Sequence, residues 1–151
     1  MIRSLLVLIL VVLSASCTHS RALRIEQQLQ RFEAAAGEPV ASFHYFGFNS
    51  WTPLGKDHLA VWTRPNEAWL IKVNGVCLDL DFAQQIGLTS SLSRVYARFD
   101  NVLVDNARCR IESIRPVDVK ALRELQREAR RNAIEVQDSG KPHSEMPDQA
   151  Q

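Results

Sequence analysis

Two cysteines in the middle of the sequence are the residues whose chemistry can be predicted most clearly. Cys77 and Cys109 lie 32 positions apart in the region that we expect to fold. In an oxidising compartment such a pair forms a disulfide, and closing a loop of this length is worth about 3–4 kcal/mol in the chain-entropy model. A redox or metal pair is the alternative, but there is no C-x-x-C spacing and no neighbouring set of histidine ligands. We therefore expect a structural disulfide between Cys77 and Cys109.

The histidines are the residues that could transfer protons. His44 lies between aromatic residues of a predicted strand, where its side chain is expected to face solvent. Asp57 and His58 are neighbours at a predicted strand, and neighbouring strand residues point to opposite faces. No H-E-x-x-H, G-x-S-x-G or P-loop pattern occurs. We expect no catalytic residue and no cofactor; a small periplasmic enzyme that uses His44 or His58 with a nearby aspartate is the alternative.

The pair Asp79 and Asp81 resembles part of a metal site. A calcium loop of the EF-hand type would need further oxygen ligands and a glycine at fixed offsets, which the sequence lacks. We expect no metal site, and we expect Asp81 to cap a short helical turn over residues 81–86.

Four side chains are candidates for contact with a partner: Trp51, Arg123, Arg127 and Arg130. Trp51 falls in a predicted loop, residues 49–56, and an exposed tryptophan there could contact a peptide, glycan or lipid. The arginines lie on a predicted helix, where they could bind anionic lipid headgroups or an acidic protein, or form an ordinary solvated face.

The other two tryptophans have a structural role in this prediction. Trp62 and Trp69 flank the turn of a predicted hairpin, and we expect them to pair across the strands on one face.

The start of the chain predicts export. Arg3 precedes an uninterrupted apolar run over residues 5–13, and the small residues 14–16 follow it, as in a secretory signal peptide. A spanning helix needs about 20 apolar residues, so a retained membrane anchor is the less favoured alternative. We expect residues 1–16 to be removed.

Cys17 would then be the first residue of the mature protein. Its surroundings resemble a bacterial lipobox: Ala15 and Ser16 fit the pattern, while Ser14 stands where leucine is usual. Lipidation gives the odd third cysteine a role, whereas ordinary cleavage near Ser16 would leave a free thiol. We expect Cys17 to carry the acyl chains of a membrane anchor, and Thr18, in place of an aspartate, favours the outer membrane.

Composition and charge agree with one exported domain. The chain has 151 residues, 46% of them hydrophobic, and a formal charge of +1. Removal of the signal peptide takes away Arg3 alone among the charged residues, which leaves about 135 residues with no net charge. A neutral domain lacks the positive electrostatic potential that binds a phosphate backbone, so we expect no nucleic-acid partner.

The elements that position these residues follow from the spacing of apolar side chains. Apolar residues recur at helical spacing over residues 20–36 and 118–136, with Asp118 as the N-cap of the second helix. Between them, strand patterns cover residues 40–46, 58–63, 68–73, 93–99, 102–104 and 108–114. In the strand over residues 93–99, we expect Val95, Ala97 and Phe99 to face the core.

We therefore expect an α+β fold in which an antiparallel sheet of about five to six strands lies between an N-terminal and a C-terminal helix. The predicted parts are a signal peptide (1–16), an anchor with the N-terminal helix (17–36), a β-rich core (37–118), the C-terminal helix (119–136) and a disordered tail (137–151).

Several short motifs between about residues 30 and 125 resemble the family catalogued as domain of unknown function 6491. They are Ala36-Gly37-Glu38-Pro39-Val40, Trp51 with Leu54-Gly55, Ala68-Trp69-Leu70, Cys77, Ile86-Gly87-Leu88-Thr89-Ser90, Arg98-Phe99-Asp100, Cys109-Arg110-Ile111 and Ile114-Arg115-Pro116-Val117-Asp118. The resemblance implies small bacterial envelope proteins, often lipoproteins, and no activity. We expect a non-catalytic module on the periplasmic side of the envelope whose partner is another envelope protein, a glycan or a lipid.

Overall fold

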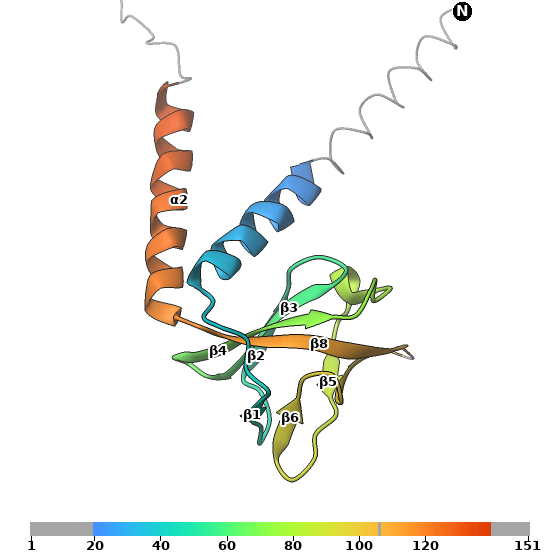
Figure 1. Cartoon of the computed structure of the whole chain (residues 1–151). Coiled ribbons are helices and arrows are strands. Elements are labelled where there is room, and N and C mark those ends of the chain that lie inside the picture. The colour runs from blue at the N-terminus through green and yellow to red at the C-terminus, as the bar shows by residue number, and fades with distance from the viewer. Residues whose placement is uncertain (1–19, 106, 140–151) are drawn as a thin grey trace, which may run out of the picture.

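The computed structural model describes residues 20–105 and 107–139, and it gives an α+β fold (Figure 1). The predicted fold class is confirmed. A helix over residues 20–35 precedes the strands and a second helix follows them. The described strands and α-helix are β1 (Ser42–His44), β2 (Ser50–Pro53), β3 (His58–Arg64), β4 (Glu67–Val73), β5 (Ile86–Leu88), β6 (Arg94–Tyr96), β7 (Asn101–Val104), β8 (Ala107–Val117) and α2 (Val119–Ser139).

Six of the described strands form an antiparallel sheet in the order β2-β3-β4-β8-β7-β5, and β1 pairs with β6 in a separate two-stranded sheet. The predicted hairpin is confirmed, because β3 pairs with β4 along its length. The long strand β8 pairs with β4 through its second half and with β7 through its first half. It therefore joins the two halves of the large sheet.

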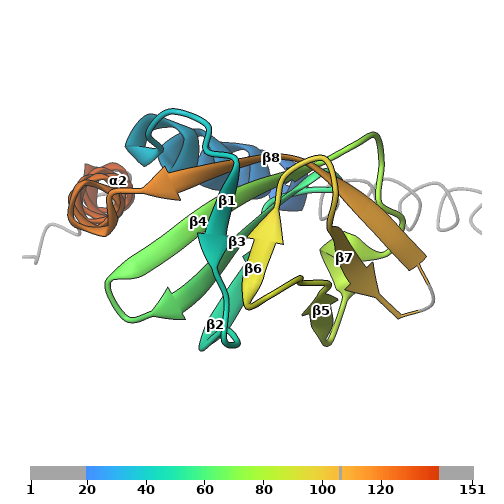
Figure 2. The ribbon, with the colours of Figure 1, turned by 60° about the horizontal axis from the view of Figure 1, so that its bottom comes forward.

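The large sheet is buried on both faces. The helix-side core lies under the N-terminal helix and the first turns of α2; the strand-side core lies under β1 and β6, which cross the other face (Figure 2). The helix-side core consists of Phe32, Ala35, Leu54, Ala60, Ala68, Leu70, Val117, Val119 and Leu122. The strand-side core consists of Phe43, Leu59, Val61, Ile71, Val73, Cys77, Leu80, Leu88, Val95, Val102, Val104, Ile111 and Ile114.

Strand β3 shows how one strand serves both cores. Leu59 and Val61 belong to the strand-side core and Ala60 between them belongs to the helix-side core. This is the period of two that a strand imposes, and burial on both faces explains why few polar residues interrupt β3 and β4.

The predicted pairing of Trp62 with Trp69 is wrong. Trp62 is opposite Ala68, and Trp69 is opposite Val61. The two tryptophans are therefore on different faces of the sheet. Trp62 packs edge-on against Phe32 of the N-terminal helix, with ring centroids 5.6 Å apart, while Trp69 packs on the strand-side core.

The start of α2 agrees with the sequence. The Asp118 carboxylate accepts hydrogen bonds from the backbone N–H groups of Lys120 and Ala121, at 2.9 and 3.0 Å, so Asp118 is the predicted N-cap. The helix continues to Ser139, three residues into the segment predicted to be disordered. Its first turns are covered through Leu122 and Leu125, but Ala133 and Val136 of the predicted apolar stripe are exposed.

Two local predictions fail. Residues 50–53 of the predicted loop form strand β2, because they pair with β3. The predicted turn at 81–86 is replaced by a 3-10 turn over Leu80–Phe82, whose cap position is Asp79, so Asp81 caps nothing. At β2, pairing with β3 overrides local sequence preference.

Candidate functional site

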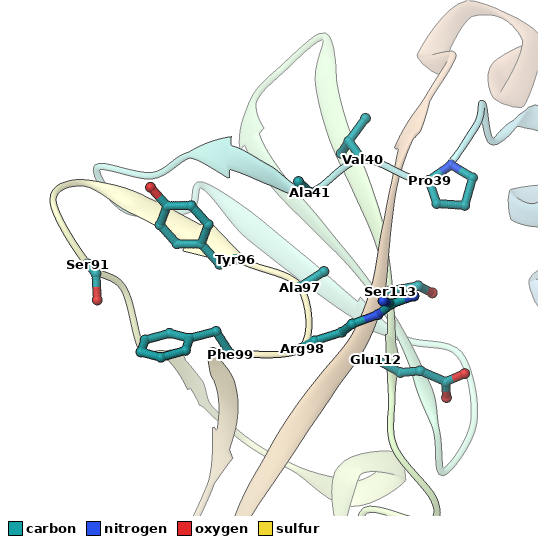
Figure 3. Close-up of a pocket in the computed structure, with 10 residues that line it drawn as sticks. All are labelled: Pro39, Val40, Ala41, Ser91, Tyr96, Ala97, Arg98, Phe99, Glu112 and Ser113. Atoms are coloured by element: carbon teal, nitrogen blue, oxygen red, sulfur yellow. The ribbon is translucent and has the colours of Figure 1, made fainter.

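A groove of about 680 Å³ opens on the side of the molecule that carries β1 and β6 (Figure 3). Its volume lies in the range of known ligand sites, about 300–1,000 Å³. It is lined by Pro39, Val40, Ala41, Ser91, Tyr96, Ala97, Arg98, Phe99, Glu112 and Ser113. Most of its lining is apolar or aromatic, which gives a hydrophobic surface with a few polar groups at its edges.

One wall is the segment that leads from the N-terminal helix into β1. Val40 donates its backbone N–H to the carbonyl of Ile114 at 2.8 Å, and Ala41 accepts from the N–H of Ala97 at 2.9 Å. The segment is therefore hydrogen-bonded to β8 at one end and to the end of β6 at the other. Pro39, which has no N–H to satisfy, precedes these two residues.

The opposite wall is a turn that the sequence did not predict. Strand β6 ends at Tyr96, and Arg98 adopts a left-handed conformation with φ of 65°. The predicted strand over residues 93–99 thus extends three residues beyond the end of β6, and the inward-facing position expected for Phe99 is wrong. Phe99 instead projects outward and is 69% exposed.

The carboxylate of Asp100 holds this turn. Its two oxygens accept hydrogen bonds from the backbone N–H of Tyr96 at 2.8 Å and from the hydroxyl of Thr89 at 2.7 Å. The Thr89 hydroxyl oxygen in turn accepts from the N–H of Asn101 at 2.8 Å. Asp100 is the one buried charged residue of the described chain, and these bonds fasten β6 to the start of β7.

A second strained segment lies next to the groove. Leu92 and Ser93 have φ values of 50° and 57°, in the left-handed region that residues with a Cβ rarely adopt. Each such residue costs of the order of 1–3 kcal/mol and persists only where its surroundings enforce it. Here the backbone carbonyl of Ser93 accepts from the N–H of Tyr45 at 2.8 Å. The side chain of Leu92 is left almost fully exposed.

The polar lining carries both signs of charge. Arg98 is exposed on the turn, and Glu112 is exposed on β8, where it forms an ion pair with Lys72 at 3.2 Å. In Figure 3 the rings of Tyr96 and Phe99 lie on one side of the groove and Pro39 and Val40 on the other. The lining includes no histidine and no cysteine.

The structure corrects the position of Trp51. Trp51 pairs with Val61 in β2 and packs partly buried against the strand-side core, so it does not extend from a loop. The loop prediction came from the neighbouring proline and glycine, but Pro53 ends an edge strand, where its missing N–H costs nothing.

The three arginines lie on α2, away from the groove lining. Arg123 donates to the backbone carbonyl of Pro65 and to the side chain of Asn66, both at 3.1 Å, and so ties the helix to the β3–β4 turn. Arg127 and Arg130 line a separate hollow with Ile134 on the exposed side of the helix. The structure therefore does not bring the predicted contact residues together.

His44 and His58 are separated in the sequence and contact different residues. His44 is exposed, as predicted, and accepts from the guanidinium of Arg94 at 2.9 Å. His58 lies 2.8 Å, Nδ1 to Oδ1, from Asp57. We expected these neighbours to point apart, which is wrong because Asp57 precedes β3 and is not bound by the alternation of a strand. Neither His58 nor Asp57 lines the groove.

The predicted disulfide is confirmed. Cys77 and Cys109 are bonded, with their Cα atoms 5.7 Å apart, and the bond joins the loop after β4 to β8. Over residues 20–105 and 107–139 no group of three or more His, Cys, Asp or Glu side chains could hold a metal ion. In the same part of the chain, no helix is long and apolar enough to span a membrane. Cys17 and the predicted signal peptide lie outside the described residues.

The family is decided by comparison with known sequences. The model of the Family of unknown function (DUF6491) matches residues 1–133. The chain belongs to this family. No curated protein and no solved structure matches the chain. Membership extends the resemblance seen in the motifs to most of the chain and brings no activity with it.

Sequence reasoning missed the groove as a site. Its residues come from four separate segments, and the strand pattern over residues 93–99 concealed the turn at Arg98. The signal that could have located it is Arg98-Phe99-Asp100, where a large apolar residue stands between charged residues directly before Asn101, in a chain segment with turn chemistry.

Proposed function

We propose that this protein is an exported bacterial envelope protein, attached to the outer membrane through lipid on Cys17, that binds a segment of another envelope protein in the groove. The signal-peptide pattern and the lipobox-like sequence support export and attachment. The disulfide Cys77–Cys109 agrees with folding in an oxidising compartment such as the periplasm.

The observation that carries the binding role is the exposed Phe99 at an apolar groove. Contiguous exposed apolar surface marks interaction sites, and Phe99 extends the apolar lining of the groove. Phe99 is held outward by the strained residue Arg98 and by the buried Asp100. A turn fixed in this way presents an aromatic residue with little loss of backbone entropy on binding.

The lining favours a polypeptide as the occupant. Apolar walls fit an apolar side chain, and Arg98 and Glu112 at the edges can bind a polar main chain, whose carbonyls accept and whose N–H groups donate. Protein interfaces also concentrate their binding energy in aromatic residues and arginine, and the groove presents Tyr96, Phe99 and Arg98 together.

Site-specific photocrosslinking in cells tests this proposal. A photoreactive phenylalanine analogue at position 99 is expected to capture one polypeptide, whereas the same group at position 46 is not, although Phe46 is 85% exposed and lies outside the groove. The captured protein is then purified and its affinity measured by calorimetry. Substituting Ala41→Trp, which fills the groove from an exposed wall position, is expected to weaken binding by about tenfold or more, equivalent to about 1.4 kcal/mol.

Two results would overturn the binding role. One is capture of the same proteins from positions 99 and 46, and the other is an affinity that Ala41→Trp leaves unchanged. Fractionation of the cells with mass spectrometry of the N-terminal peptide tests the anchor separately, since acyl chains on Cys17 add a defined mass.

The alternative function is a small periplasmic enzyme. The close contact of His58 with Asp57 favours it, since a carboxylate can orient an imidazole for proton transfer. We rank it second because the pair does not line the groove. A His58→Ala variant that loses a hydrolytic activity of the purified protein, with unchanged stability, would reverse this order.

A further inference from the structure

The loop that follows β4 presents large apolar side chains to solvent. Val76, Leu78 and Phe82 are 63%, 70% and 65% exposed, and they lie within seven positions of one another. We name these three residues the apolar loop face. None of them lines the groove, so the groove does not account for their exposure.

The loop is fastened to the body of the protein at two buried residues. Cys77 is buried and bonded to Cys109, and its N–H donates to the carbonyl of Lys56 at 2.8 Å. Leu80 is also fully buried. These inward residues separate the outward ones, so that Val76, Leu78 and Phe82 are displayed by a fixed backbone.

The apolar loop face meets the start of the N-terminal helix at Phe82. The guanidinium of Arg21 sits 4.5 Å from the centre of the Phe82 ring and donates to the backbone carbonyl of Asp81 at 3.2 Å. The first turn of this helix and the loop are therefore in direct contact, although about 60 residues separate them in the sequence.

This contact brings the loop close to the proposed lipid anchor. Cys17 precedes Ser20, the first described residue of the helix, by three positions. Three residues span at most about 11 Å. If the acyl chains on Cys17 enter a bilayer, the first turn of the helix and the loop beside it must lie near that bilayer's surface.

Resting on the anchor of the proposed function, we propose that Val76, Leu78 and Phe82 insert into the surface of the membrane that holds Cys17. The contact fixes the orientation of the domain relative to the membrane. Arg21, which covers one side of the Phe82 ring, is placed to bind a lipid phosphate, as cationic side chains do at membrane interfaces. Asp79 and Asp81 lie on the same loop, so charge attraction is weak and the apolar side chains supply the driving force.

Photocrosslinking to lipid in living cells tests the proposal on the full chain. The photoreactive phenylalanine analogue is placed at position 78 or 82, and at position 46 as the matched exposed control. Mass spectrometry of the purified protein is expected to find phospholipid adducts at 78 and 82 and none at 46. Adducts to protein in place of lipid at 78 and 82, or equal lipid adducts at 46, would overturn the proposal.

The same sample separates this proposal from the proposed function. The N-terminal peptide reports whether Cys17 is acylated, and the adducts report whether the loop contacts lipid. Acylated Cys17 without lipid adducts at 78 and 82 would overturn the loop contact and leave the anchor intact. Absence of acyl chains on Cys17 would overturn the anchor and, with it, the loop contact that depends on it.

A second measurement uses the acylated protein in vesicles of phosphatidylethanolamine and phosphatidylglycerol. Side chains of interfacial segments reach about 5–10 Å into the boundary between headgroups and acyl chains. The additional fluorescence of a Phe82→Trp variant should therefore be quenched by lipids brominated near the headgroup, and that of Phe46→Trp should not. Equal quenching of the two variants would contradict the proposal.

Discussion

The two faces of the large sheet are covered in different ways. On the helix side, small residues such as Ala60 and Ala68 let the helices approach, and Phe32 fills the space between. On the strand side, larger branched residues such as Ile71 and Ile114 meet β1 and β6, which have only three residues each. One cover is made of long elements with continuous apolar stripes, and the other is made of short pieces.

Short strands cannot hold their position by pairing alone. The strand side is accordingly fastened by bonds that the helix side lacks within the described residues: the disulfide Cys77–Cys109 and the buried carboxylate of Asp100. The groove lies on this fastened side. The comparison indicates that burial of apolar surface builds the scaffold, while specific polar and covalent links fix the shape of the candidate binding surface.

The largest expected loss of stability comes from a substitution on the helix side. Phe32→Ala removes a fully buried ring that packs on Trp62, and it should lower the free energy of unfolding by about 3–5 kcal/mol. Urea denaturation measures this loss. Phe46→Ala, at an 85% exposed position, is the control and should change little. A loss below about 1 kcal/mol for Phe32→Ala would contradict the role assigned to the N-terminal helix.

Removing the disulfide tests the covalent fastening of the strand side. The double variant Cys77→Ala and Cys109→Ala opens a loop of 32 residues and should cost about 3–4 kcal/mol of stability. Thermal unfolding with and without a reductant supplies the control, because the reductant should destabilise the parent protein and leave the double variant unchanged. Equal stability of parent and variant would show that packing alone holds the loop.

Loss of the Asp100 carboxylate tests the polar fastening. Asp100→Ala leaves the N–H of Tyr96 and the hydroxyl of Thr89 without their acceptor, and should cost about 2–3 kcal/mol. Faster hydrogen exchange at the Tyr96 amide would locate the effect at the groove. Glu124→Ala, an exposed carboxylate on α2, should be close to neutral. Unchanged exchange at Tyr96 would argue against this account of the turn.

The smallest expected effect is a pH dependence on the strand side. Burial raises the pKa of Tyr45 above its usual value of about 10. The unfolded chain then loses the tyrosine proton at a lower pH than the folded chain does. The contribution of Tyr45 protonation to the free energy of unfolding is complete below about pH 10 and declines as the pH rises further. Chemical denaturation from about pH 9 to about pH 11 should show a smaller decline for Tyr45→Phe than for the parent. Identical declines would contradict the burial effect.

Much of the fold could be predicted because the sequence patterns that specify it are local. The hairpin of β3 and β4, the cap at Asp118 and both helices follow from apolar spacing and capping chemistry over a few residues. The disulfide followed from the number of cysteines together with the expected export. Trp51 was misplaced because a proline and a glycine predict a loop unless a partner strand is known, and only pairing with β3 supplies that information.

The sequence by itself determined the α+β class, the central hairpin, the pairing of Cys77 with Cys109 and the family. These depend on residue type and short-range spacing. The tertiary structure alone decided that Trp62 and Trp69 lie on different faces, that Phe99 points outward and that Phe82 lies against Arg21. The physical reason is that register, left-handed turns and contacts between distant segments are fixed by pairing and packing across the chain, which no short stretch of sequence contains.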